Sequence, residues 1–83
     1  MTHHEYTTRG TCSRFIEFDL EDNKLHNIRF HGGCDGNLRA IGKLLEGADA
    51  REAADTLRGN LCGKRPTSCG DQLSKAIDQA LLA

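Results

Sequence analysis

Four cysteines are the residues of this 83-residue chain with the most specific chemistry: Cys12, Cys34, Cys62 and Cys69. Each lies at an expected boundary between elements, and three of them stand directly beside a glycine. Cysteines of a hydrophobic core would fall inside the apolar stripes of strands or helices. Turns and helix starts instead suit thiolates that must converge on one point. Thiolates bind zinc and iron, and they attack electrophiles.

Two of these cysteines lie where the thiolate form is favoured. Cys34 and Cys69 are near expected helix starts, where the backbone dipole and unpaired N–H groups stabilise negative charge. The gaps between the cysteines are long and contain no Cys-x-x-Cys pair, so the usual zinc-knuckle signature is absent. Spacing alone leaves four interpretations open, namely a shared metal site, inert thiols, a redox-active thiol or disulfides.

Three further side chains are candidate auxiliary ligands. Asp35 and Asp71 each lie within two residues of a cysteine, and His31 directly precedes the Gly32-Gly33 turn. Helix capping is the simpler interpretation for both aspartates. The other histidines are weaker candidates, because they fall in an expected N-terminal tail or on a strand face: His3, His4 and His26.

Charge and hydropathy exclude several classes of function. Eleven Lys and Arg against twelve Asp and Glu give a net charge of −1, so we expect no non-specific nucleic-acid binding. No run approaches the ~18 apolar residues of a membrane span, and the N-terminus lacks the apolar region of a secretory signal. We therefore expect a cytoplasmic protein with no membrane partner. In a reducing cytoplasm, cysteines are more often thiols or metal ligands than disulfides.

The N-terminal half carries the period-two pattern of strands. Residues 13–20 and 25–30 alternate apolar and polar side chains, and the polar turn 21–24 joins them into a hairpin. A further strand over residues 5–9 would give a more stable three-stranded sheet. We expect one face of the second hairpin strand to hold His26, Ile28 and Phe30.

The C-terminal half carries helical patterns. Residues 35–46 have an apolar stripe, and Asp49 with Glu52 resembles a capping box for a helix ending at Gly59. A last helix follows Pro66. Strands before helices predict an α+β fold, with an antiparallel two- or three-stranded sheet and about three helices packed on one face. The expected stripes are Leu38, Ile41, Leu44 and Leu45 in the first helix, Ala53, Ala54 and Leu57 in the second, and Leu73, Ala76, Ile77, Ala80 and Leu81 in the last.

Several motifs together resemble the small four-cysteine TSCPD-domain proteins. They are Gly10-Thr11-Cys12, the run from Phe30 to Leu38, Leu45-Glu46-Gly47, Cys62-Gly63 and the run from Pro66 to Leu73. The resemblance extends from about Tyr6 to Leu82 and includes all four cysteines. It departs at Gly70, where the family has the proline of its name. We expect residues 1–5 to be a disordered tail and residues 6–83 to form a single TSCPD-type domain.

The family resemblance carries a functional implication. Related domains occur at the C-terminal end of vitamin B12-dependent ribonucleotide reductases, which implies a ribonucleoside-diphosphate reductase label, nucleotide binding and DNA synthesis. Reductase chemistry needs a radical cofactor, a barrel and an allosteric site, and 83 residues hold none of these. The chain is therefore expected to be an accessory module for a ribonucleotide reductase or another larger protein.

A second, more distant resemblance is to the iron–sulfur cluster scaffold proteins. They share the order of strands, a Gly-Cys turn opening a helix, and a late cysteine opening the last helix. This resemblance implies that Cys12, Cys34 and Cys69 converge on one metal, with Cys62 as a fourth ligand. The expected cofactor is zinc or an iron–sulfur cluster. The alternatives are a thiol-active or scaffold-like protein, and a structural interaction domain with inert cysteines.

Overall fold

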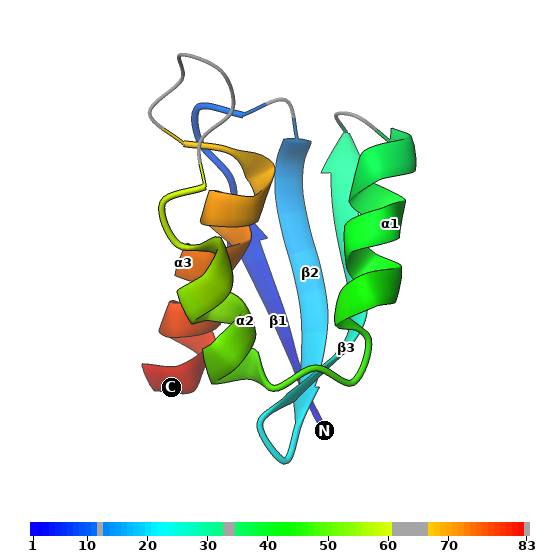
Figure 1. Cartoon of the computed structure of the whole chain (residues 1–83), viewed down its shortest axis with the longest axis vertical. Helices are drawn as coiled ribbons and strands as arrows, with labels where there is room; N and C mark the ends of the chain where they lie inside the picture. The colour runs from blue at the N-terminus through cyan, green and yellow to red at the C-terminus, as the bar shows by residue number, and fades with distance from the viewer. Residues whose placement is uncertain (12, 33–34, 61–66, 83) are drawn as a thin grey trace.

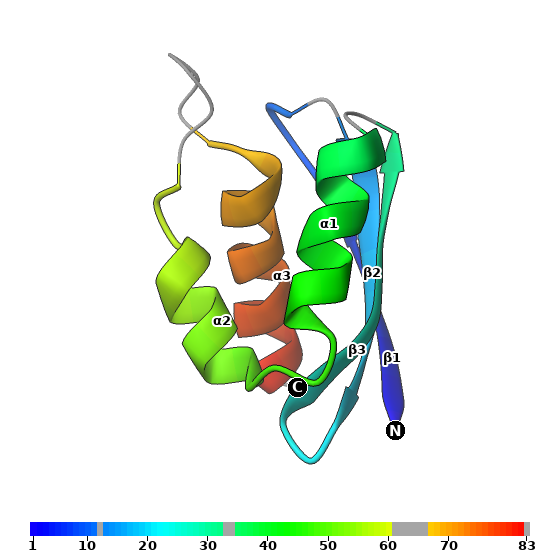
Figure 2. The same ribbon diagram turned by 45° about the vertical axis from the view of Figure 1, so that its right-hand side comes forward.

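A computed structural model describes residues 1–11, 13–32, 35–60 and 67–82. Its described part is an α+β fold in which three antiparallel strands precede three helices, as predicted. All three helices of the described segments lie on one face of the sheet (Figures 1 and 2). The elements in chain order are β1 (Thr2–Thr7), β2 (Ser13–Glu21), β3 (Lys24–Gly32), α1 (Asp35–Leu45), α2 (Ala50–Leu57) and α3 (Cys69–Leu82).

Strand β1 corrects the expected disordered tail. It begins at Thr2 and pairs antiparallel with β2 from Thr2 opposite Leu20 to Thr7 opposite Phe15. Its side chains alternate between the two faces of the sheet, and those on the core face hold the strand in place. The His4 ring stacks on buried Phe18 with centroids 5.6 Å apart, and Tyr6 packs against the core. Residues 2–5 are therefore part of the sheet.

The β2–β3 hairpin contains a tight turn and two register shifts, one between Ser13 and Phe15 and one between Glu17 and Asp19. Asp22 and Asn23 have φ values of 52° and 63°, the paired positive values of a type I′ turn, at the predicted polar turn. Asn27 has φ 54° and lies opposite a register shift between Glu17 and Asp19, which marks a β-bulge.

The bulge corrects the expected face of β3. It adds one residue to the strand, so the side-chain alternation changes phase at Asn27. Leu25 is fully buried and shares the core side with Ile28 and Phe30. His26 pairs with Asp19 on the opposite side, so it does not share a face with Ile28 and Phe30.

The hydrophobic core lies between the sheet and the helices. Ile16 and Phe18 from β2 meet Leu73 and Ile77 from α3, and all four are fully buried. The stripes expected for α2 and α3 pack in or against this core. In α1 the stripe holds except at Leu44, which is 81% exposed because it lies outside the line formed by the other members. Those members are Leu38, Ile41 and Leu45.

Gly42 permits the close packing of α1 on β3. A Cβ atom at Gly42 would lie 3.0 Å from the carbonyl oxygen of Ile28, a rigid backbone atom. We expect Gly42→Val to lower the free energy of unfolding by about 1–3 kcal/mol, because the added carbons force α1 away from the sheet. Urea denaturation measures the effect.

Gly36 supplies the matched control in the same helix. A Cβ there meets nothing within 4 Å. Gly36→Ala should keep stability unchanged or raise it by up to about 1 kcal/mol. Equal losses in the Gly36 and Gly42 variants would contradict the proposed role of close packing.

Candidate functional site at the start of α3

Cys69 is the first residue of α3, as the sequence predicts, and Ser68 caps this helix. The Asp71 N–H donates to Ser68 Oγ at 3.1 Å, which satisfies one of the unpaired donors of the first turn. The Ser68 hydroxyl in turn donates to the carbonyl oxygen of Asn60. Cys69 therefore occupies a fixed helix start that is tied to the segment after α2.

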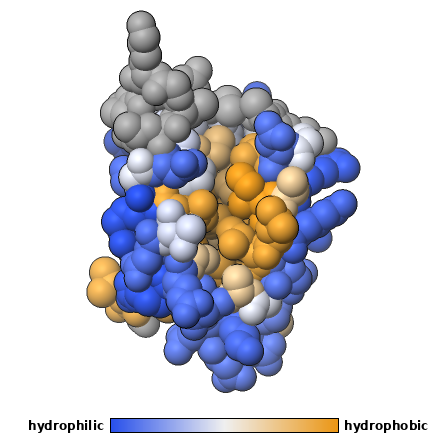
Figure 3. Space-filling view, viewed as in Figure 1, coloured by the Kyte–Doolittle hydropathy of each residue, from blue (hydrophilic) through white to orange (hydrophobic). Residues whose placement is uncertain are grey.

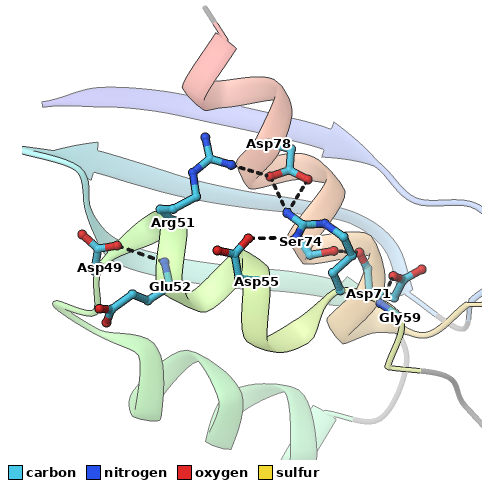
Figure 4. Close-up of polar contacts among 9 residues, drawn as sticks. Asp49, Arg51, Glu52, Asp55, Gly59, Asp71, Ser74 and Asp78 are labelled. Atoms are coloured by element: carbon cyan, nitrogen blue, oxygen red, sulfur yellow. Dashed lines mark hydrogen bonds and ion pairs between the residues drawn. The ribbon is translucent and has the colours of Figure 1, made fainter.

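Asp71 is the centre of a buried polar network beside Cys69. Its residue exposure is only 5%, and its carboxylate accepts the Gly59 N–H at 2.8 Å and the Thr67 hydroxyl at 2.5 Å. The Thr67 hydrogen bond first, and the Gly59 N–H second, lower the pKa of Asp71 below its ordinary value. The ionised carboxylate connects the end of α2 to the start of α3 (Figure 4).

Gln72 extends this network to the N-terminal part of the chain. Its Nε2 donates to Thr67 Oγ1 at 3.0 Å, and its Oε1 accepts the Arg9 N–H at 3.1 Å. Gln72 is 3% exposed, so both ends of a buried amide are satisfied. We call Thr67, Ser68, Asp71 and Gln72 the polar hub.

Ser13 links the start of β2 directly to the thiol. Its Oγ lies 3.2 Å from Cys69 Sγ, and its residue exposure is 5%. The Thr8 hydroxyl donates to the Ser13 carbonyl at 2.6 Å, which fixes the backbone at this position. A buried hydroxyl in contact with sulfur is the kind of outer interaction that orients and tunes a metal-binding thiolate.

Cys12, Cys34 and Cys62 lie outside the described residues, but residues next to Cys12 and close to Cys62 contact the start of α3. Ser13, which follows Cys12, contacts Cys69 and pairs with Gly32 at the end of β3. Asn60 accepts the Ser68 hydroxyl at the other side of the α3 start. The start of β2, the end of β3 and the starts of α1 and α3 thus lie at the same end of the fold (Figure 1).

The auxiliary candidates occupy different places. Both carboxylate oxygens of Asp71 already accept hydrogen bonds. Ser68 rather than Asp71 caps α3. His31 stacks on Phe15 with ring centroids 4.1 Å apart, and its Nε2 lies 3.5 Å from Glu17 Oε2. Asp35 begins α1, and its side chain lies outside the described part.

Sequence patterns missed most of the polar hub. The pattern also missed Ser13 beside the hub: regular alternation puts it on the face of Phe15, but a register shift between Ser13 and Phe15 turns it to the buried side. Gln72 is buried with hydrogen-bond partners at both ends of its amide, one of them distant in sequence. The available signal was the density of hydroxyl, amide and carboxyl groups directly around Cys69. Such density at the start of an otherwise apolar helix indicates a buried network.

A family model for the TSCPD domain matches residues 1–81. The chain belongs to the TSCPD-domain family. Neither a search of curated proteins nor a search of solved structures finds a match, so the likeness to iron–sulfur scaffolds stays a prediction. None of the helices in the described segments is long and apolar enough to cross a membrane.

The structure explains most of the family's namesake motif in this TSCPD domain. Thr67 and Asp71 bind each other, Ser68 caps the helix, and Cys69 opens it. Gly70 replaces the proline without disturbing this arrangement. A Cβ at Gly70 would meet its nearest neighbour, Asn60 Nδ2, at 3.4 Å, an ordinary contact, so crowding does not require glycine here.

Proposed function

We propose that this TSCPD domain binds zinc or an iron–sulfur cluster through Cys12, Cys34, Cys62 and Cys69. The observation that carries the proposal is the position of Cys69. It is held at a helix start, 3.2 Å from Ser13 Oγ, at the end of the fold where the described neighbours of the other cysteines meet. Four thiolates form a closed tetrahedral zinc site, and they are also the usual ligands of iron–sulfur clusters.

The surroundings of Cys69 suit a bound thiolate. The first turn of α3 presents backbone N–H groups and the positive end of the helix dipole. The Ser13 hydroxyl can donate to the sulfur from the β2 side. The polar hub keeps these groups in place, because its side chains are buried and hydrogen-bonded on both sides of the helix start.

Family membership and fold support an accessory role. Related domains occur at the C-terminal end of vitamin B12-dependent ribonucleotide reductases, and the described residues form a three-stranded sheet with three helices rather than a barrel for a radical cofactor. The domain therefore serves a larger protein in ribonucleotide reduction and DNA synthesis, and its metal supports structure or electron transfer rather than independent reductase chemistry.

Metal analysis of anaerobically purified protein, with a UV-visible spectrum, tests the metal site. We expect at least one equivalent of zinc, or iron with sulfide and a coloured spectrum. Zinc alone gives no visible band. Protein that carries no metal and binds neither zinc nor iron after reduction would overturn the proposal.

Ser13→Ala should weaken metal binding by about tenfold or more, because it removes the hydroxyl that contacts Cys69 Sγ. Competition against a chromophoric chelator measures the affinity. Thr56→Ala is the matched control, since it removes an exposed hydroxyl on α2. An affinity that is the same in the Ser13 variant and in the unmodified chain would show that this contact does not tune the site.

A further inference from the structure

The face of the sheet opposite the helices carries a compact group of ionisable side chains. Tyr6 of β1 packs against the core, so His3 and Glu5, which alternate with it, lie on the other face. Glu17 and Asp19 of β2 are the direct partners of Glu5 and His3, respectively, and share that face. The helices, α3 among them, cover the other side of the sheet (Figure 2), so this group lies apart from the polar hub.

Three of these side chains have the geometry of metal ligands. One ligand atom from each of His3, Glu5 and Glu17 lies within 4.8 Å of the others. Glu5 and Glu17 are directly opposite each other on neighbouring strands, an arrangement that is destabilising for like charges. A cation between the two carboxylates would reverse that repulsion.

Asp19 supplies an independent observation. Its Oδ1 lies 2.7 Å from His3 Nδ1, and its Oδ2 accepts the Asn27 amide at 2.9 Å. A carboxylate that receives the Nδ1 proton of a histidine fixes the ring and leaves Nε2 as the basic nitrogen. Metal-binding histidines almost always have such a partner.

Two side chains of β3 border the cluster. His31 Nε2 lies 3.5 Å from Glu17 Oε2 and, among the described residues, this buried atom has no hydrogen-bond partner. Arg29 is exposed and lies opposite Glu17 in the β2–β3 register. His31 thus contacts Glu17 from the β3 side, while His3 and Glu5 approach it from β1.

We propose that His3, Glu5 and Glu17 bind a divalent transition-metal ion, with Zn²⁺ the best match, and that Asp19 positions His3. Imidazole nitrogen and carboxylate oxygen are both established zinc ligands. Three protein ligands leave a coordination position open to solvent, whereas four thiolates leave none. This site uses no cysteine, so it stands apart from the site proposed at Cys69.

A zinc titration followed by imidazole ¹H–¹⁵N NMR tests the site in the full, reduced chain. The first equivalent of Zn²⁺ is added before the titration begins, so that the cysteines are supplied. We expect the His3 ring nitrogens to shift with further Zn²⁺, while those of His26, which pairs with Glu46, stay in place. Unchanged His3 signals at millimolar Zn²⁺ would overturn the proposal, whatever metal the cysteines bind.

Variants separate the ligands from the positioning residue. His3→Ala and Glu17→Gln should abolish the second binding event, whereas Glu21→Gln, an exposed carboxylate at the end of β2, should retain it. Asp19→Asn should weaken binding by about 10–100-fold and change the tautomer of His3 seen in its ¹⁵N shifts before metal is added. Equal zinc affinity in the Glu17 and Glu21 variants would also overturn the proposal.

Discussion

Replacing Asp71 with Ala should lower the free energy of unfolding by about 2–5 kcal/mol. The change leaves the Gly59 N–H and the Thr67 hydroxyl without their acceptor in a buried place. Each buried polar group left unsatisfied costs about 1–3 kcal/mol. Urea denaturation followed by circular dichroism measures the loss.

Asp78 on the same helix is the matched control. Its side chain is 32% exposed, and it pairs with Arg58 at 2.9 Å and Arg51 at 3.4 Å on the surface between α2 and α3 (Figure 4). Surface ion pairs contribute about 0–1 kcal/mol, so Asp78→Ala should have a small effect. Similar losses in the two variants would show that Asp71 acts as an ordinary surface charge.

The Asp71 hydrogen bonds also predict a pH dependence. The pKa of Asp71 is lower in the folded chain than in the unfolded chain, because the Thr67 hydroxyl and the Gly59 N–H stabilise the carboxylate. Its contribution is therefore fully present above the unfolded pKa and is lost as the pH falls through the folded pKa. As the pH falls below about 5, the unmodified chain should lose this part of its stability, and the Asp71→Asn variant, which has no carboxyl group at this position, should not. The loss begins near the ordinary carboxyl pKa of about 4.

Metal loading should produce the second large effect. If free zinc exceeds its dissociation constant by about a thousandfold, binding to the folded state adds about 4 kcal/mol. For a domain of this length, that gain raises the melting temperature by about 15–30 °C. Thermal melts of reduced protein, with zinc and with a chelator, measure the difference.

Cys69→Ser isolates the thiol from general effects of zinc. The variant keeps a small polar side chain at the start of α3 but loses the thiolate, so most of the zinc-dependent rise should disappear. Coincident melts of loaded and chelated unmodified protein would contradict a stabilising cysteine site. An undiminished rise in the Cys69 variant would place the stabilising metal elsewhere.

Local patterns were sufficient to predict the fold class, because each of them reports local geometry and burial. The patterns are the alternation around Ile16 and Phe18, the polar turn at Asp22 and Asn23, and the stripe at Leu73 and Ile77. The bulge at Asn27 was missed, because the change of phase between Leu25 and Ile28 is equally compatible with a regular strand that has an apolar residue on each face. The β1 start was missed because its polar side chains resemble a solvated tail until pairing with β2 is known.

The candidate site was predictable at the level of residue type but not of partnership. Clustered hydroxyl and carboxyl groups around Cys69 were visible, whereas the contact between Ser13 and Cys69 joins residues 56 positions apart. Asp71 was interpreted as a helix cap because capping is a local rule. Its carboxylate instead accepts the nearby Thr67 hydroxyl and the N–H of Gly59, which belongs to the segment after α2.

The start of α3, with Cys69, can be anchored only late in synthesis, because the contacts that hold it join residues far apart in the sequence. The Arg9–Gln72 hydrogen bond spans 63 residues and the Ser13–Cys69 contact spans 56, so neither can close until α3 has left the ribosome. The β2–β3 hairpin, joined by a two-residue turn, needs no such delay. A nascent chain stalled before Thr67 would therefore contain the hairpin but not the anchored start of α3. Any metal that binds at Cys69 must arrive after α3 has been translated.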